Sequence, residues 1–236
     1  MPRPQILALI IAAGLASSSF AQDKRFAFTL VDPAHAQIDM HLRDGRDSLY
    51  RRLGSLVKEL EGQKKEVVVA MNAGMFLTDR SSVGLLVVNG KKLKPLNRRT
   101  EATGNFYMQP NGVFGVRPDH TAFICTSADF PVLAEVRCAT QSGPMLVVKG
   151  AMNKLFTAGS TNVHIRNGVG IRSDGQLVFA ISKEPVTFYD FAAFFIAQGC
   201  VDALYLDGFV SKAYMPAQGL RQLDGQLGPL ISVVKR

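Results

Sequence analysis

Short apolar segments separated by Gly, Pro, Asn and Asp residues make up most of the chain, and this pattern predicts many β-strands. The Asn89-Gly90 pair is the strongest hairpin signal, because both positions tolerate a positive φ angle. Asp32-Pro33 is expected to form the turn between the first two strands. The expected strands are 25–31, 36–41, 66–70, a hairpin over 85–93, 113–116, 121–125, 145–148, 169–172, 176–181 and 203–206.

Two segments have helical periodicity instead. In 47–61, leucines recur at helical spacing opposite charged residues, with Asp47 or Ser48 as the N-cap and Gly62 at the end. The segment 188–198 is apolar on most sides, so we expect it to be covered by other elements.

Residues flanking the second helix support its boundaries. Thr187 and Asp190 have capping-box spacing, and Gly199 is expected to stop the helix. Two helices among many strands, without alternating βαβ order, predict an α+β fold. We expect mixed or antiparallel β-sheets with few covering helices, in a single domain spanning 22–236, and no Rossmann fold.

The first 21 residues have the features of a signal peptide. Arg3 supplies positive charge, 6–15 is apolar, and Ser19-Phe20-Ala21 fits a small-x-small cleavage site before Gln22. The apolar run is too short for a comfortable membrane span. The sequence therefore predicts a signal peptide over 1–21, a periplasmic or secreted protein, and no stable membrane span after cleavage.

The net charge of +8 first suggests an acidic partner. The basic residues are dispersed in pairs and form no basic helix with interleaved aromatic residues, so we expect no nucleic-acid partner. A basic surface suits an anionic glycan or a phosphorylated sugar. The alternative interpretation is that the basic residues are only solvated at the surface and bind no partner.

The few cysteines and histidines limit the chemistry. Cys125 and Cys138 flank a predicted turn and can pair in an oxidising compartment, whereas Cys200 resembles a buried small hydrophobic residue. No spacing matches a zinc site, and no phosphate loop or paired metal carboxylates are present. We therefore expect no metal site and no cofactor.

The most informative stretch is the apolar run 203–206, which ends abruptly in Asp207-Gly208. A strand that delivers a carboxylate to a sheet edge is typical of a catalytic or ligand-binding site. An ordinary Asp-Gly turn is the alternative interpretation. Ser211 adds a hydroxyl group four residues later, but no Gly-x-Ser-x-Gly elbow accompanies it.

Two further loops carry amide, hydroxyl and glycine groups. Asn72 follows a predicted strand, and Gly74 permits close backbone approach. Ser142 and Gly143 precede the strand 145–148, where their backbone N–H groups can form an anion nest. Purely structural roles remain open for both loops.

A fourth loop contains His164, Arg166 and Asn167, followed by Gly168. Arg166 suits bidentate capture of phosphate or carboxylate. His164 lies on the same side of an extended segment and can act as an acid or a base, although a structural histidine is the alternative.

As an ordered set, these loops resemble the phosphodiester glycosidase family. The resemblance covers most of 66–216. The matching motifs are Asn72-Ala73-Gly74-Met75-Phe76, Val83-Gly84-Leu85, Asn105-Phe106-Tyr107, Asn111-Gly112-Val113-Phe114, Gln141-Ser142-Gly143-Pro144, Ile165-Arg166-Asn167-Gly168-Val169-Gly170 and Leu206-Asp207-Gly208. The resemblance implies an exported hydrolase that cleaves the glycosidic bond of a sugar-1-phosphodiester in an envelope or extracellular glycoconjugate.

The resemblance also implies roles for individual residues. Asp207 would stabilise or attack the oxocarbenium-like carbon, with His164 as a second catalytic candidate, while Arg166 and backbone N–H groups would hold the phosphate. The expected substrate-binding residues are Asn72, Gly74, Ser142, Gly143, Arg166, Asn167, Gly208 and Ser211.

The chain departs from the family pattern directly after Gly208. Phe209 and Val210 stand where the family has small residues, and a phenylalanine there is expected to narrow the pocket or to alter access to the backbone. A non-catalytic envelope module that binds anionic polysaccharide is therefore an alternative. A structural or interaction protein of the cell envelope is another.

Overall fold

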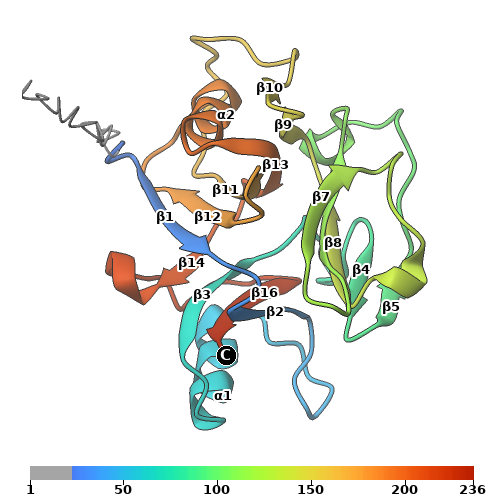
Figure 1. Cartoon of the computed structure of the whole chain (residues 1–236), viewed down its shortest axis with the longest axis vertical. Helices are drawn as coiled ribbons and strands as arrows, with labels where there is room; N and C mark the ends of the chain where they lie inside the picture. Colours follow the sequence, from blue (N-terminus) through green and yellow to red (C-terminus); the bar gives the residue numbers. More distant parts are fainter. Residues whose placement is uncertain (1–22) are drawn as a thin grey trace, which may run out of the picture.

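The computed structural model describes residues 23–236, so the predicted signal peptide over 1–21 lies outside the described residues. Within the described part, no helix has the length and apolar character needed to cross a membrane. Three β-sheets and two α-helices form one domain (Figure 1).

Each sheet combines strands that are distant in sequence, and every pairing described between residues 23 and 236 is antiparallel. The first sheet has the order β1 (Phe26–Val31), β12 (Leu177–Ser182), β11 (Asn167–Arg172), β13 (Cys200–Asp207), β9 (Met145–Val148), β10 (Ala151–Met152). The second has β15 (Leu220–Arg221), β14 (Ala213–Met215), β3 (Val67–Asn72), β16 (Leu230–Lys235), β2 (Ala36–His41). The third has β5 (Lys91–Lys94), β4 (Leu86–Val88), β8 (Cys138–Ser142), β6 (Gly112–Val116), β7 (Ala122–Thr126).

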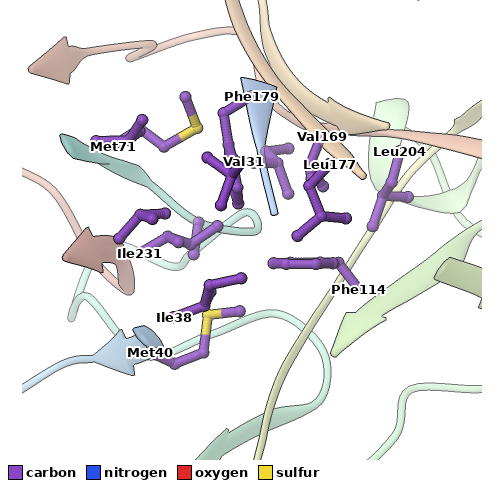
Figure 2. Close-up of a cluster of buried hydrophobic side chains, with 14 of the residues drawn as sticks. Val31, Ile38, Met40, Met71, Phe114, Val169, Leu177, Phe179, Leu204 and Ile231 are labelled. Carbon is purple, nitrogen blue, oxygen red and sulfur yellow. The ribbon is translucent and has the colours of Figure 1, made fainter. Parts of the chain in front are cut away.

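The inner faces of the three sheets share one hydrophobic core. Side chains alternate between the two faces of a strand, so each strand sends every second residue inward. Figure 2 shows the result: Phe179 and Leu204 from the first sheet pack near Met71 and Ile231 from the second and Phe114 from the third. The sheets are therefore held by shared packing, and their strand ends are fixed relative to one another.

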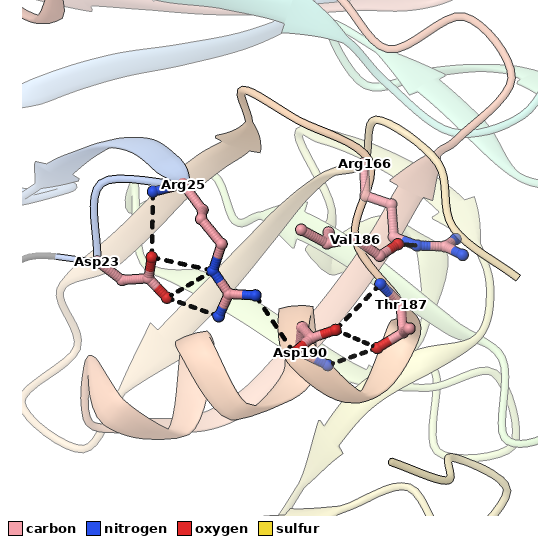
Figure 3. Close-up of polar contacts among 6 residues, drawn as sticks. All are labelled: Asp23, Arg25, Arg166, Val186, Thr187 and Asp190. Carbon is pink, nitrogen blue, oxygen red and sulfur yellow. Dashed lines mark hydrogen bonds and ion pairs between the residues drawn. The ribbon is translucent and has the colours of Figure 1, made fainter. Parts of the chain in front are cut away.

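The helix α2 (Phe188–Ala197) covers the outer face of the first sheet through a cluster of phenylalanines. Its N-terminus is closed by the predicted capping box, in which the Thr187 side chain accepts from the Asp190 N–H and Asp190 accepts from the Thr187 N–H (Figure 3). Gly199 adopts a φ angle of 77° just after the helix. The predicted boundaries of this helix are confirmed.

The other helix, α1 (Leu53–Gly62), packs against the outer face of the second sheet, but its predicted start is wrong. The residue before the helix is Arg52, whose side chain makes no capping bond. Asp47 has a φ angle of 62°, in a turn that is closed by backbone and side-chain bonds between Asp44 and Ser48. The local turn therefore delays the helix, although the apolar spacing begins earlier.

The predicted strands are confirmed, including the Asn89-Gly90 hairpin, but several other strands were not predicted. The predicted loop at Gln141 and Ser142 is the end of β8, so that expectation is wrong. The strands β14 and β16 are among those that were not predicted. The turn at Asp32-Pro33 is present, yet it joins strands of different sheets rather than a hairpin.

All three cysteines are free thiols. Cys125 on β7 and Cys138 on β8 lie on opposite sides of β6, which separates them by two strand spacings of about 4.8 Å each. That separation exceeds the reach of a disulfide. Burial raises the pKa of the Cys125 thiol to about 11 and that of Cys200 to about 12. The expected pairing is absent, and Cys200 is buried as predicted.

Candidate functional site

Four polar residues stand at strand ends that converge where the sheets meet. Asn72 ends β3, Ser142 ends β8, Asn167 begins β11 and Asp207 ends β13. The sequence predicted all four as site residues, and all four are buried. The shared core brings together segments that are up to 135 residues apart, from Asn72 to Asp207.

The side-chain amide of Asn167 links these ends directly. Its Nδ2 donates to the backbone oxygen of Asn72 at 2.8 Å and to Asn72 Oδ1 at 3.2 Å. Its Oδ1 accepts from the backbone N–H of Asp207 at 3.0 Å and from the Ser211 hydroxyl at 3.3 Å. One amide therefore ties the first sheet to the second and fixes the backbone that carries Asp207.

The carboxyl group of Asp207 is buried and forms no ion pair within the described chain. Burial raises its pKa above the ordinary value of 3.8, against the opposing effect of the backbone N–H groups of Phe209, Val210 and Gly208 and of the Asn72 amide. Removing a charge from water without a counter-ion is costly, which gives this raised pKa its physical cause.

Hydrogen bonds fix the loop that follows Asp207. The Ser211 hydroxyl donates to the backbone oxygen of Asp207, and the Lys212 N–H donates to Asn72 Oδ1 at 2.9 Å. The Ser142 hydroxyl donates to the backbone oxygen of Leu206 at 2.6 Å. Ser142 and Ser211 therefore brace the backbone around Asp207 from two sides.

The side-chain amide nitrogen of Asn72 has no regular hydrogen-bond partner. Its Nδ2 is buried and makes no hydrogen bond of normal geometry to the described residues, although it acts on the Asp207 carboxyl group. A buried donor without a partner costs roughly 1–3 kcal/mol, so such atoms are uncommon in folded proteins. Its position beside Asp207 marks this corner as suited to a polar ligand.

Arg166 is completely buried, but it does not join the amide cluster directly. Its guanidinium group donates to the Val186 backbone oxygen at 2.8 Å (Figure 3). It also donates to the Tyr205 hydroxyl at 3.2 Å and to both oxygens of Asn162. It also stacks at 3.7 Å over the Phe188 ring. No carboxylate of the described residues pairs with it, and burial lowers its pKa.

Tyr205 connects Arg166 with Asp207. Its hydroxyl accepts a hydrogen bond from Arg166, and it lies on the strand that ends at Asp207. Burial raises the pKa of the Tyr205 phenol, whereas Arg166 lowers it and Asp207 raises it further. A Cβ atom on Gly208 would lie 1.3 Å from the Tyr205 hydroxyl oxygen, which places that oxygen against the loop after Asp207. No role was predicted for Tyr205 from the sequence, although a phenol in a buried strand needs a polar partner.

The glycines at the site make room for protein groups. A Cβ on Gly74 would come within 2.2 Å of the Gln141 backbone oxygen, and one on Gly143 within 2.7 Å of the Phe106 backbone oxygen. Gly208 is required by the Tyr205 hydroxyl in the same way. Close approach of other protein groups accounts for these three glycines without any ligand contact.

Two side chains that the sequence placed at or beside the site, His164 and Phe209, are exposed to solvent. His164 is exposed and makes no side-chain hydrogen bond within residues 23–236, and only its backbone bonds to Val186. The Phe209 side chain is 93% exposed, and the expectation that it narrows the pocket or alters access to the backbone stays a prediction. The structure therefore joins Asn72, Asn167, Asp207 and Ser211 by direct hydrogen bonds and ties Ser142 to them through the Leu206 backbone. Arg166 contacts Tyr205 on the same strand as Asp207, and His164 lies apart.

The site therefore combines one buried carboxyl group, one buried guanidinium group and several fixed amide and hydroxyl groups. Such a set can bind a polar ligand, balance an anion and stabilise a developing positive charge. In the part of the chain that is described, no group of three or more His, Cys, Asp or Glu side chains is placed to hold a metal ion.

Comparison with known proteins places this architecture among relatives. The family model described as phosphodiester glycosidase matches residues 65–227. The chain is 34% identical over 186 residues to the uncharacterized protein YigE of Escherichia coli. The match covers 78% of this chain and 72% of YigE. It is 28% identical over 159 residues to the prophage-derived uncharacterized protein YomE of Bacillus subtilis, covering 62% of this chain and 24% of YomE.

Solved structures share the fold at low sequence identity. The zebrafish N-acetylglucosamine-1-phosphodiester alpha-N-acetylglucosaminidase catalytic domain, described as auto-inhibited by its pro-peptide, matches with a TM-score of 0.60 and 15% identity. The match covers 92% of this chain and 85% of that one. A hypothetical protein from Synechocystis matches with a TM-score of 0.52 and 14% identity, covering 89% and 59% of the two chains.

The buried charge of Asp207 predicts a pH-dependent cost to stability. The pKa of Asp207 is raised in the folded state. At a pH between the ordinary pKa of 3.8 and the folded-state pKa, the folded state therefore binds more protons than the unfolded state. The free energy of unfolding therefore falls as pH rises through that window. We expect Asp207→Asn to be more stable than the wild type in urea at pH 7, and this gain to shrink as the pH approaches 3.8.

The exposed turn carboxylate Asp174 supplies the control, because Asp174→Asn removes a charge without removing a buried one. It should show no comparable gain at pH 7. Lower stability of Asp207→Asn at pH 7 would show that the hydrogen bonds to the carboxylate outweigh its desolvation.

Proposed function

Because the chain belongs to the phosphodiester glycosidase family, we propose that it is a hydrolase that cleaves the glycosidic bond of a sugar-1-phosphodiester. One observation carries this proposal: the buried carboxyl group of Asp207 and the buried guanidinium group of Arg166 both lack an ionic partner in the described chain, yet both act on Tyr205. Unpaired buried charges cost stability. An anionic phosphodiester would compensate Arg166, and the positive charge that develops on the sugar ring in the transition state would compensate Asp207.

The two charges fit the two parts of the substrate. As the C1–O bond breaks, the electron pair leaves with the phosphate oxygen and positive charge develops on the sugar ring. The Asp207 carboxylate would stabilise or attack this carbon, and water would then supply the hydroxyl group at C1 and release a proton. Phosphate is already a good leaving group, so a second carboxylic acid is not obligatory.

Arg166 would balance the charge of the phosphate. Its guanidinium group has five N–H donors, and the hydrogen bonds to Val186, Tyr205 and Asn162 use four of them. The remaining N–H is on the nitrogen that donates to Tyr205. Asn72 Nδ2, also without a regular partner, would orient a sugar hydroxyl group, with Ser142 and Ser211 bracing the site.

A second candidate function is a non-catalytic module that binds anionic polysaccharide. The backbone N–H groups of Gly208, Phe209 and Val210 act on the Asp207 carboxylate, so in this conformation they are directed at the protein rather than at a phosphate. Saturable binding without release of reducing sugar would support this module.

The catalytic role of Asp207 predicts a large loss of turnover. We expect Asp207→Asn to lower kcat at least about 100-fold on a panel of hexose-1-phosphodiesters, because the developing positive charge loses its carboxylate. Release of reducing sugar would be measured. Asp202→Asn changes a half-buried carboxylate at the opposite end of the same strand and should keep near wild-type turnover. Full activity of Asp207→Asn would contradict the role.

The role of Arg166 predicts a change in substrate preference. Arg166→Lys retains a positive charge but loses the planar guanidinium group, which is held by four hydrogen bonds and keeps one N–H for the phosphate, so we expect kcat/KM for phosphodiesters to fall about 10-fold or more relative to simple glycosides. Arg137→Lys is the matched control, because Arg137 is a largely buried arginine that is paired with Asp39. Unchanged preference in a folded Arg166→Lys protein would refute phosphate recognition.

We also propose that the protein acts in the periplasm or outside the cell, on an envelope or extracellular glycoconjugate, because 1–21 has the features of a signal peptide. Expression of the full chain in a bacterial host, followed by fractionation and N-terminal sequencing, tests this. The expected product is exported and begins near Gln22. An uncleaved chain retained in the cytoplasm would exclude export.

A further inference from the structure

The connection between β10 and β11 runs beside α2 and is fixed at its two ends (Figure 1). Asn153 anchors the first end, because its buried side-chain amide donates to the Met145 backbone oxygen at 3.0 Å. His164 anchors the second end through two backbone hydrogen bonds with Val186. The segment between these anchors, 154–163, is exposed except at two positions, so it has little packing of its own.

An aromatic stack and a pair of hydrogen bonds attach the 154–163 segment to the fold between its anchors. Phe156 stacks on Phe188 of α2, with ring centroids 5.1 Å apart. One guanidinium nitrogen of Arg166, Nη2, donates to the Asn162 backbone oxygen at 2.8 Å and to Asn162 Oδ1 at 3.1 Å. No other hydrogen bond of the described chain joins this segment to a residue beyond its anchors. Asn162 is therefore the residue through which the segment covers Arg166.

A cavity of about 110 Å³ lies between the 154–163 segment and the start of α2. Asn162 and Phe188 line it, and the same two residues accept from Arg166 and stack on it at 3.7 Å. One water molecule needs only about 10–15 Å³ of such volume, so the cavity has room for a small anion. A single layer of side chains therefore separates this cavity from the buried guanidinium group.

Arg166 lacks the free N–H groups for a bidentate contact with phosphate in this arrangement. Its hydrogen bonds to Val186, Tyr205 and Asn162 leave one N–H, whereas a bidentate contact needs two. Both N–H groups of Nη2 are directed at oxygens of Asn162, which are neutral. A phosphate anion would accept from the same nitrogen and also balance the buried positive charge, which an amide oxygen does not.

We propose that Asn162 is a positioning residue that acts through Arg166: it competes with phosphate for Nη2, and a phosphate group that enters the cavity displaces it. This inference rests on the proposed function and adds a control on the entry of substrate. Displacement frees both N–H groups of Nη2, so Arg166 has three donors for the anion. Val186 and Tyr205 continue to hold the guanidinium group, and the 154–163 segment moves between its anchors.

Titration with inorganic phosphate tests this competition without any turnover. Asn162→Ala removes one of the two competing oxygens, so the state that can bind phosphate is more populated. We expect phosphate to bind this variant about 3- to 10-fold more tightly than the wild type in isothermal titration calorimetry. A residue that only supports the shape of the site would give weaker binding when it is replaced.

Thr161→Ala is the matched control, because Thr161 is the exposed neighbour of Asn162 in the same segment. Its side chain makes no hydrogen bond within residues 23–236, and only its backbone oxygen accepts from Val163. The affinity for phosphate should therefore not change in this variant. Weaker or unchanged binding by Asn162→Ala would overturn the proposal, as would a lack of phosphate binding by both the wild type and Asn162→Ala.

Hydrogen exchange of the 154–163 segment gives an independent readout. Phosphate should speed exchange of the Asn162 and Val163 amides in the wild type, because displacement from Arg166 opens the local turn bonds of these amides. Asn162→Asp would pair a carboxylate with the guanidinium group, so it should slow this exchange and weaken phosphate binding about 10-fold or more. Exchange that phosphate slows or leaves unchanged would contradict the displacement.

The competition and the proposed function fail in different measurements. If the wild type releases no reducing sugar from any phosphodiester, the enzymatic proposal fails, and the phosphate titrations still decide the role of Asn162. If the wild type turns over phosphodiesters while Asn162→Ala binds phosphate no more tightly, only the competition is refuted.

Discussion

The side-chain amide of Asn167 is the interaction on which the arrangement of the site depends. It satisfies acceptors on β3 and donors on β13 and the following turn, so one buried group sets the spacing between two sheets. An amide suits this task, because it donates and accepts in fixed directions and carries no charge that burial would penalise. Hydrophobic packing brings the strand ends together, and Asn167 fixes their register.

The hydrogen bonds that join the sheets at the site come from uncharged groups, so they do not neutralise Asp207 or Arg166. If salt bridges joined the sheets instead, the charge of Asp207 or Arg166 would be neutralised by its partner. Here the carboxyl group receives only N–H donors, and the guanidinium group donates to neutral oxygens and stacks on an aromatic ring. The fold carries the energetic cost of both, which is typical of functional sites rather than of structural ones.

The sequence predicted the local features well and the long-range ones less well. The strong turn at Asn89-Gly90 and the capping box at Thr187 depend on neighbouring residues, so both were predicted. The residues at strand ends were also identified. Pairing of β1 with β12, and the true partners of Arg166, depend on tertiary packing that periodicity does not encode. No role was predicted for Tyr205 because it lies within the apolar run 203–206, which indicates only a buried strand.

The position of β16 has a consequence for how the chain is made. This strand lies between β3 and β2, and its Leu230 pairs with Asn72. The edge strand β2 therefore joins the second sheet only through β16, so β2 and one edge of β3 stay unpaired until the much later residues 230–235 are in place. Unpaired strand edges promote aggregation, so β16 protects both neighbours at once when it inserts between them.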